Sequence, residues 1–219
     1  MGRALLDEIQ KSNKSATMKR RIVTHFIYNG DATITDLSKD MDLSIPTITK
    51  LIDEMCDDGY VDDNGKLETN GGRHPNLYGL NPNAGYFLGV VVTKTCLSFS
   101  VVDFRGTVLN YKNQIPFTIE NNVECLDKVC EETLAYIISL PYEKEKYLNV
   151  CISLHGRVNP FTGCSYGTFN FAQTPLSEMF SERIGLNVCI DNDSRTTAYG
   201  EYMKHSVKCP KNVIFINLS

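Results

Sequence analysis

The chain changes its hydrophobic periodicity near residue 71, and this change constrains the fold more than any other feature. Upstream, apolar residues recur at the three- and four-residue spacing of amphipathic helices, whereas downstream they form short runs such as Tyr86–Val92 that are typical of strands. Between them lies Gly71-Gly72-Arg73-His74-Pro75, which is rich in turn-forming residues. The 219 residues suffice for two modest domains. We therefore predict a helical domain at 1–80 and an α/β domain at 81–219.

The upstream part predicts three helices with the spacing of a helix-turn-helix. The first ends at Asn29-Gly30, and the second begins at Thr33, a candidate N-cap with an acid, Asp36, three residues later. The third is capped by Ser44 and stopped by Gly59. The positions expected to face the core are Ile22, Phe26, Ile27, Leu37 and Met41 in the first two helices and Ile45, Ile48, Leu51, Ile52 and Met55 in the third.

Two short runs after the third helix, Tyr60–Val61 and Leu77–Leu80, are expected to be the strands of a wing. In a winged helix-turn-helix the third helix enters the major groove of double-stranded DNA. Hydroxyl groups and a cation near its start suit contacts to base edges and phosphates. The candidate DNA contacts are Ser44, Thr47, Thr49 and Lys50. The alternatives are a plain helical bundle with a polar surface and a winged helix that binds protein.

Arg73 has two interpretations. Its glycine neighbours permit close approach of the backbone to DNA, and an arginine can enter a narrow minor groove. It could equally be an exposed arginine in a flexible hinge. The charge distribution gives weak support to DNA contact, because residues 1–25 hold six basic and two acidic side chains while the whole chain carries −4.

Composition excludes several classes of protein. No apolar run approaches the ~18 residues of a membrane span, and the N-terminus has no apolar core like that of a secretory signal. The eight cysteines are scattered without a Cys-x-x-Cys pair. This pattern favours free thiols in a reducing cytoplasm over a disulfide framework or a zinc site.

The downstream part predicts alternating strands and helices. Strands are expected at 87–92, 97–103, 108–114, 148–153, 188–190 and 213–218, and helices at 121–140, 176–184 and 194–205. The buried side of the first of these helices is expected to hold Val123, Leu126, Val129, Leu134 and Ile137. The order of elements is similar to the first lobe of the actin-like ATPase (ribonuclease H-like) fold of sugar kinases, which places the chain in the α/β class.

Five motifs together resemble the ROK family (repressors, open reading frames, kinases), in its branch of xylose- and N-acetylglucosamine-type repressors. None is decisive alone, but their order and spacing are specific. They are Ser44–Lys50, Gly71–Pro75 with Leu80–Tyr86, Val102–Gly106, His155–Asn159 with Gly163, and Asp191–Asp193 with Gly200-Glu201.

The resemblance implies a sugar-responsive repressor that binds a DNA operator as a homodimer or larger oligomer and controls genes of carbohydrate metabolism. In kinase members the aspartate that matches Asp193 is the general base. Asn170, Asn192 and Asp193 match residues that would bind sugar hydroxyls, and amide and carboxylate groups together offer both donors and acceptors. The alternative for Asp191-Asn192-Asp193 is a helix N-cap, and the two roles can coexist.

The chain departs from the kinase pattern at its first phosphate loop. Kinase members carry Asp-x-Gly-x-Thr, whereas the matching residues here are Val91, Thr93 and Thr95. A magnesium ligand and the glycine that lets phosphate approach are thus replaced, so we expect no phosphoryl transfer. Lys94 is either a phosphate contact or a solvated lysine. A ROK-type sugar kinase with an appended helical domain is the alternative function.

The chain stops at 213–219, within a motif of the family. The resemblance places a second phosphate loop, a Glu-x-Gly-His sugar contact and a cysteine-rich structural zinc site after this point. We therefore expect the sugar-kinase-like domain to be incomplete at its C-terminus, with no cofactor and no metal in this chain.

Overall fold

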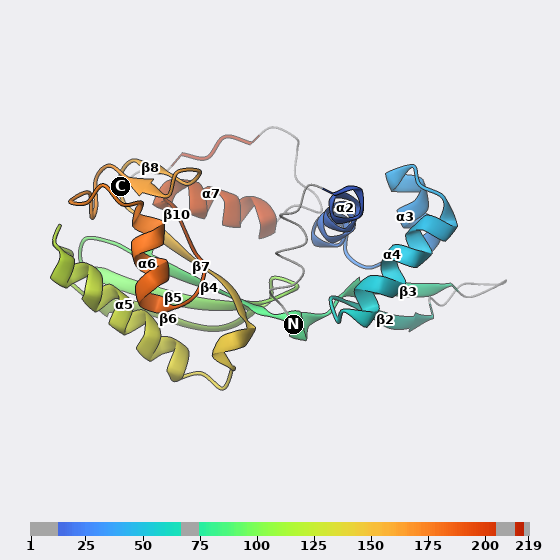
Figure 1. The fold of residues 1–219 in the computed structure, drawn as a ribbon, viewed down its shortest axis with the longest axis horizontal. Helices are drawn as coiled ribbons and strands as arrows, with labels where there is room; N and C mark the ends of the chain where they lie inside the picture. The colour runs from blue at the N-terminus through green and yellow to red at the C-terminus, as the bar shows by residue number, and fades with distance from the viewer. Residues whose placement is uncertain (1–12, 67–74, 205–212, 217–219) are drawn as a thin grey trace. The chain divides into compact units, whose positions relative to one another are not determined.

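The computed structural model describes residues 13–66, 75–204 and 213–216, which fall in two compact units (Figure 1). The first unit comprises Met1–Gly85 together with Asp103–Thr107, and the second comprises Tyr86–Val102 and Val108–Ser219. The first unit is therefore not one continuous stretch of chain, because a short turn from within the second unit's sequence belongs to it.

The first unit is a winged helix-turn-helix, as predicted. Its helices are α2 (Lys14–Asn29), α3 (Ile34–Met41) and α4 (Ile45–Asp57), and its strands are β1 (Ala32–Thr33), β2 (Val61–Lys66) and β3 (Asn76–Leu80), followed by the 3-10 turn η1 (Pro82–Ala84). The three strands form an antiparallel sheet in the order β1-β3-β2. The short strand β1, which was not predicted, lies directly before α3 and pairs with the wing.

Local capping sets the ends of these helices. Thr33 and Asp36 form a reciprocal capping box at the start of α3, and the Ser44 hydroxyl accepts a hydrogen bond from the Thr47 N–H at the start of α4. Gly30 ends α2 with φ +78°, a left-handed conformation that favours glycine. These three boundaries confirm the prediction.

The core of the first unit lies between the helices and the wing. Its buried apolar residues are Ile22, Phe26, Ala32, Leu37, Met41, Ile48, Leu51, Ile52, Met55, Val61 and Leu80. Two expected core residues are exposed instead, Ile27 by 42% and Ile45 by 52%. Ile27 follows Phe26 by one position, which turns it about 100° away from the buried stripe. Ile45 is in the first turn of α4 and projects beyond the core.

The turn Asp103–Thr107 packs against the wing within the first unit. The ring of Phe104 is half-buried and lies 6.0 Å from that of Tyr60. Arg105 donates a hydrogen bond to the carbonyl of Leu80 and pairs with Asp31 at 3.5 Å. Gly79 makes this pairing possible, because a Cβ there would lie 2.0 Å from Asp31 Oδ1.

The second unit is built on a five-stranded mixed sheet in the order β10-β7-β4-β5-β6. The strands are β4 (Tyr86–Val92), β5 (Cys96–Asp103), β6 (Val108–Pro116), β7 (Tyr147–Leu154) and β10 (Val188–Asn192). β10, β7 and β4 are parallel, whereas β5 and β6 pair antiparallel. A small antiparallel hairpin, β8 (Val158–Asn159) and β9 (Cys164–Ser165), follows β7. This is the predicted actin-like lobe.

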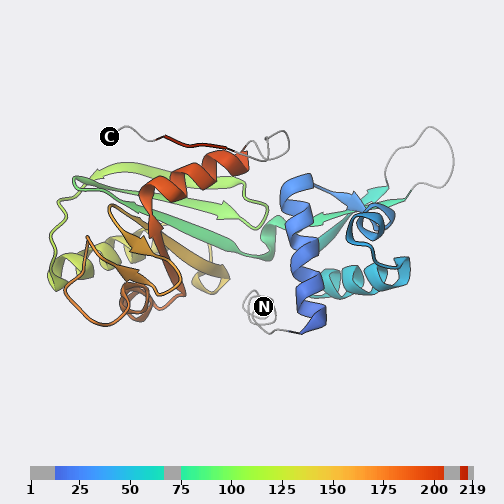
Figure 2. The same ribbon diagram turned by 90° about the horizontal axis from the view of Figure 1, so that it is seen from above.

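Helices cover both faces of this sheet (Figure 2). α5 (Val123–Ile138) and α6 (Leu176–Ile184) lie on one face and α7 (Asp193–Lys204) on the other, while the 3-10 turn η2 (Lys144–Lys146) precedes β7. The predicted stripe of α5 is buried at Leu126, Val129 and Ile137 and half-buried at Leu134. Val123 is 42% exposed, because the first turn of the helix extends past the core.

The predicted strand at 213–218 is wrong in its described part. Residues 213–216 are exposed and pair with no strand among the described residues, and an unpaired segment lacks the ladder bonds that stabilise a strand.

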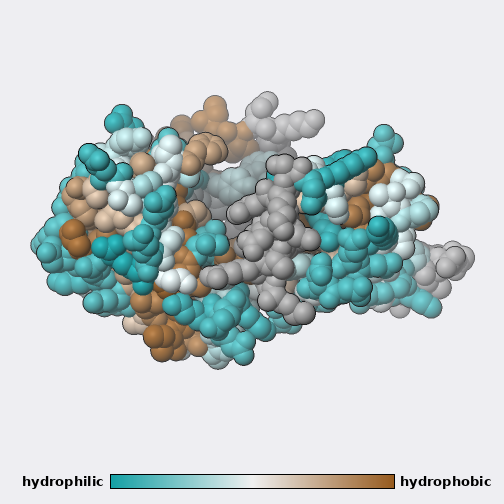
Figure 3. Space-filling model, in the orientation of Figure 1, coloured by the Kyte–Doolittle hydropathy of each residue, from teal (hydrophilic) through white to brown (hydrophobic). Residues whose placement is uncertain are grey.

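On the face seen in Figure 3, apolar and hydrophilic side chains are interspersed. Within the described residues, no helix combines the length and apolar character needed to cross a membrane.

Candidate nucleic-acid interface and ligand pocket

The candidate nucleic-acid interface is the first half of α4. Its buried side, which holds Ile48, Leu51, Ile52 and Met55, packs into the core of the first unit. The opposite side begins at the exposed cap Ser44 and includes exposed Lys50. The helix thus presents its polar N-terminal turns to solvent, as a recognition helix does.

The predicted threonine contacts are partly engaged in the helix itself. The Thr47 hydroxyl lies 2.8 Å from the Ser44 hydroxyl, and the Thr49 hydroxyl donates to the carbonyl of Ile45 at 2.9 Å. Both threonines are half-buried. Thr49 therefore offers an acceptor and a methyl group rather than a donor, whereas Lys50 makes no hydrogen bond or ion pair with the described residues and keeps its donors for a phosphate.

Ile45 is a candidate contact that the apolar pattern assigned to the core. It is exposed beside Ser44, with Pro46 also exposed. Apolar side chains at this position of a recognition helix can meet the methyl group of thymine. The only sequence signal was its place immediately after the cap, where the first turn often lies outside the core.

Ion pairs organise the other end of α4. Lys19 on α2 is buried and pairs with Glu54 at 3.1 Å and Asp58 at 3.7 Å. Lys19 is one of the six basic residues in 1–25. Because it is paired with carboxylates, that segment has one less cation available to contact phosphates. Arg21 also has a structural bond, to the carbonyl of Met41 at 3.0 Å. Arg73 lies outside the described residues.

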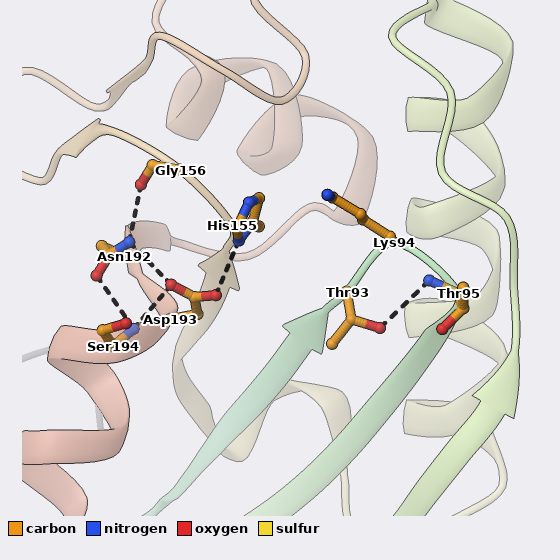
Figure 4. A pocket seen from close by; sticks show the side chains of 8 residues that line it. All are labelled: Thr93, Lys94, Thr95, His155, Gly156, Asn192, Asp193 and Ser194. Atoms are coloured by element: carbon orange, nitrogen blue, oxygen red, sulfur yellow. Dashed lines mark hydrogen bonds and ion pairs between the residues drawn. The ribbon is translucent and has the colours of Figure 1, made fainter. Parts of the chain in front are cut away.

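A candidate ligand pocket of about 660 Å³ in the second unit opens where three parallel strands end (Figure 4). It is lined by the loop after β4, the segment after β7 and the start of α7. The lining residues are Thr93, Lys94, Thr95, His155, Gly156, Asn192, Asp193 and Ser194. The carboxyl ends of parallel strands are the usual ligand site of open α/β sheets.

The loop after β4 is closed by the side chain of Thr93. The Thr93 hydroxyl donates to the carbonyl of Cys96 at 2.9 Å and accepts from the N–H group of Cys96 at 3.0 Å. It also accepts from the N–H group of Thr95 at 3.4 Å (Figure 4). In a phosphate loop such N–H groups are directed at phosphate oxygens. Here the hydroxyl oxygen takes their hydrogen bonds. Lys94 is exposed and extends from the loop into the pocket.

Asn192 and Asp193 lie at the junction of β10 and α7. The Asn192 side chain donates to the carbonyl of Gly156 at 2.8 Å and to Asp193 Oδ1 at 2.9 Å, and it accepts from the N–H groups of Ser194 and Arg195. It is thus a helix cap, the alternative considered for this cluster. Asp193 Oδ1 also accepts from the Ser194 N–H, while Oδ2 faces the pocket 3.3 Å from His155 Nδ1.

Asn170 is not among the residues that line this pocket. Its Oδ1 accepts from Asn121 Nδ2 at 2.7 Å, and its N–H donates to Asn121 Oδ1 at 3.1 Å. Asn121 lines a smaller neighbouring pocket of about 200 Å³ that shares Thr93, Lys94 and His155 with the first. The structure therefore brings Asn192 and Asp193 together and places Asn170 next to an adjoining pocket.

His155 is the pocket residue that motif matching did not assign a role. It directly follows the last residue of β7, and this position after a buried strand is the sequence feature that could have predicted its place in the pocket. Its ring lies between Asp193 and the neighbouring pocket. The described residues contain no group of three or more side chains that could hold a metal ion.

The fold and the pocket together define a class: a winged helix-turn-helix unit followed by an actin-like lobe with a polar pocket at its strand ends. A model of winged helix-turn-helix DNA-binding domains matches residues 15–62, and the model of the ROK family matches residues 87–219. The chain belongs to the ROK family, which confirms the resemblance in the motifs.

Individual relatives include repressors and kinases. A xylose repressor of Bacillus spizizenii is 22% identical over 96% of this chain and 54% of its own. A glucokinase of Streptomyces coelicolor is 31% identical over 61% of this chain and 41% of its own. The chain spans about half the length of the curated relatives it matches.

A solved structure supports the fold across both units. The crystal structure of a ROK family transcriptional regulator, a homologue of the E. coli MLC protein, superposes with a TM-score of 0.62 at 22% identity. The match covers 87% of this chain and 48% of that one.

Proposed function

We propose that the chain is the DNA-reading and effector-binding part of a sugar-responsive transcriptional repressor of carbohydrate metabolism. The observation that carries the proposal is the N-terminal half of α4, where Ser44, Ile45 and Lys50 are exposed while the other side of the helix is buried in the winged-helix core. The similarity to xylose repressors supports the same function. The effector class follows from the polar pocket, since hydroxyl-rich ligands require paired donors and acceptors.

On DNA, the start of α4 would enter the major groove. Ser44 and Lys50 would contact the phosphate backbone, and Ile45 would contact a thymine methyl group. Glu54 and Asp58 do not oppose this placement, because they lie late in the helix and pair with Lys19. Because helix-turn-helix proteins commonly read paired half-sites, the repressor would act as a homodimer or larger oligomer. Arg73 would add a minor-groove contact.

In the pocket, Asp193 Oδ2 and His155 are the groups best placed to bind sugar hydroxyls. Asn192 would hold these groups in position without contacting the sugar, because its amide already bonds to the carbonyl of Gly156 and to the first turn of α7. Asn170 would act through the adjoining pocket, with Asn121. This assigns direct contact to Asp193 and a positioning role to Asn192.

The alternative function, sugar phosphorylation, is disfavoured by the loop after β4. Val91 supplies no carboxylate for magnesium at the position where kinase members carry aspartate. The Thr93 hydroxyl takes the hydrogen bonds of N–H groups that a phosphate would need. The similarity to a glucokinase is explained by the shared lobe, so we propose that this protein binds its sugar without transferring phosphate to it.

Selection of bound DNA fragments, with and without a panel of sugars, tests the proposal. The selected sites should share a sequence, and one sugar should release them. Lys50→Ala should weaken binding and reduce the salt slope by about one unit, because one phosphate contact is lost. Lys128→Ala, which removes the same charge from the exposed side of α5, is the matched control and should change neither. Unchanged affinity of folded Lys50→Ala protein would contradict the proposed docking of α4.

A further inference from the structure

Two cysteines lie directly opposite each other in the parallel strands β7 and β10. The strand register pairs Cys151 with Cys189. Neighbouring strands are about 4.8 Å apart, and paired residues of parallel strands direct their side chains to the same face. Disulfides join Cα atoms that are about 4.4–6.8 Å apart. The spacing of the two paired strands therefore lies within the range that a disulfide spans.

The surroundings of the two thiols favour reaction at Cys189. Both thiols are free, Cys189 is exposed and Cys151 is half-buried. On its other side Cys151 pairs with Gly89 of β4, which has no side chain to crowd it. The neighbouring Cys151 thiol lowers the pKa of Cys189, while the Cys189 thiol and burial raise the pKa of Cys151.

Two other cysteines in the described part of the chain, Cys56 and Cys130, differ from this pair. Burial raises the pKa of the Cys56 thiol to about 11 and that of Cys130 to about 12, with nearby carboxylates adding to the effect at Cys56. A thiol with a raised pKa contains little thiolate and reacts slowly. Cys56 and Cys130 are therefore expected to react more slowly than Cys189.

We propose that Cys151 and Cys189 form an oxidisable dithiol whose oxidant is a small hydroperoxide. The Cys189 thiolate attacks one oxygen of hydrogen peroxide, the O–O bond breaks, and the sulfur becomes a sulfenic acid as hydroxide leaves. The Cys151 sulfur then attacks the Cys189 sulfur. The S–S bond forms, the S–O bond breaks, and the leaving hydroxide takes the Cys151 proton as water. Overall, two thiols are oxidised to a disulfide and one peroxide is reduced to two waters.

The disulfide would join the two strands that lead into the ligand pocket. Four residues after Cys151, the segment following β7 carries His155, and three residues after Cys189, β10 ends at Asn192. The cross-link would lie behind the pocket and leave its lining residues in place.

Peptide mapping of the whole chain after treatment with hydrogen peroxide tests the proposal. Under non-reducing conditions we expect one major cross-linked peptide, joining Cys151 to Cys189 and lighter by two hydrogen atoms, which reductant releases. Cys151→Ser should instead accumulate a Cys189 sulfenic acid that dimedone traps, because no second thiol resolves it. Cys56→Ser is the matched control and should give the wild-type cross-link.

A second measurement does not depend on the fold of any variant. Phenylarsine oxide binds two neighbouring thiols, so it should protect Cys151 and Cys189 of the reduced wild-type chain from alkylation and leave the slow alkylation rate of Cys56 unchanged. A wild-type chain in which both thiols stay reduced under peroxide, or in which Cys189 pairs with a different cysteine, would overturn the proposal. Alkylation of Cys189 that phenylarsine oxide does not slow would do the same.

Discussion

Replacement of Thr93 by valine removes one hydroxyl and keeps nearly the same shape, so it tests the closed loop after β4 directly. The hydroxyl makes two hydrogen bonds of good length, to the carbonyl and the N–H of Cys96, and a longer one to the N–H of Thr95. A net hydrogen bond contributes about 0.5–1.5 kcal/mol, and an orphaned, partly buried N–H costs about 1–3 kcal/mol. Since water reaches part of the loop, we expect a loss of about 2 kcal/mol.

Urea unfolding of the second unit measures this loss. For an m-value of about 2 kcal/mol/M, the midpoint should fall by about 1 M. Hydrogen exchange in peptides from β4 and β7 assigns the transition to the second unit rather than the first. Thr95→Val is the matched control two residues away. Thr95 is exposed, and the change should stay within about 0.5 kcal/mol. Equal stability of the Thr93→Val and wild-type proteins would refute the view that this hydroxyl holds the loop closed.

Two further outcomes follow from the contacts. Gly79→Ala should lower the melting temperature of the first unit, because its Cβ would lie 2.0 Å from Asp31 Oδ1. Adding Asp31→Ala should restore part of the loss. A fully stable Gly79→Ala protein would show that Asp31 moves away freely. Asp193→Asn should weaken sugar binding about tenfold or more in calorimetry, the effect of losing a hydrogen bond to a charged group. Asp191→Asn is the control, because Asp191 bonds to Arg195 and does not line the pocket; it should leave the affinity within about twofold. Equal affinities of the two variants would show that Asp193 does not bind the sugar.

Helices with strong local signals were predictable to within a residue or two. The helix predicted at 176–184 is observed as α6, Leu176–Ile184, and Gly185 ends it in a left-handed conformation. Thr33 and Ser44 likewise marked the starts of α3 and α4, since capping bonds join residues only three apart. Hydrophobic periodicity wrongly assigned Ile27 and Ile45 to the core. Periodicity indicates which side of a helix is apolar, but it does not indicate how far the core extends along the helix.

The pocket shows the limit of reading roles from motifs. Asp193 could be placed near a ligand from its motif, but the engagement of Asn192 in the cap of α7 depends on the direction of its amide. Asn170 matched a sugar-binding position, yet its partner is Asn121, 49 residues earlier in the chain. Nothing in the local sequence around Asn121 or Asn170 indicates that these two residues bond to each other.

Elements whose causes are local could be predicted from the sequence: the helices, their caps, and the strands expected at 87–92 and 148–153, which are observed at 86–92 and 147–154. Tertiary structure alone decided which distant residues meet. It assigned the turn Asp103–Thr107 to the first unit, and it paired Cys151 with Cys189. The physical reason is that strand order and register arise from burial of a whole sheet, so contacts across it are properties of the packed unit and not of any short segment.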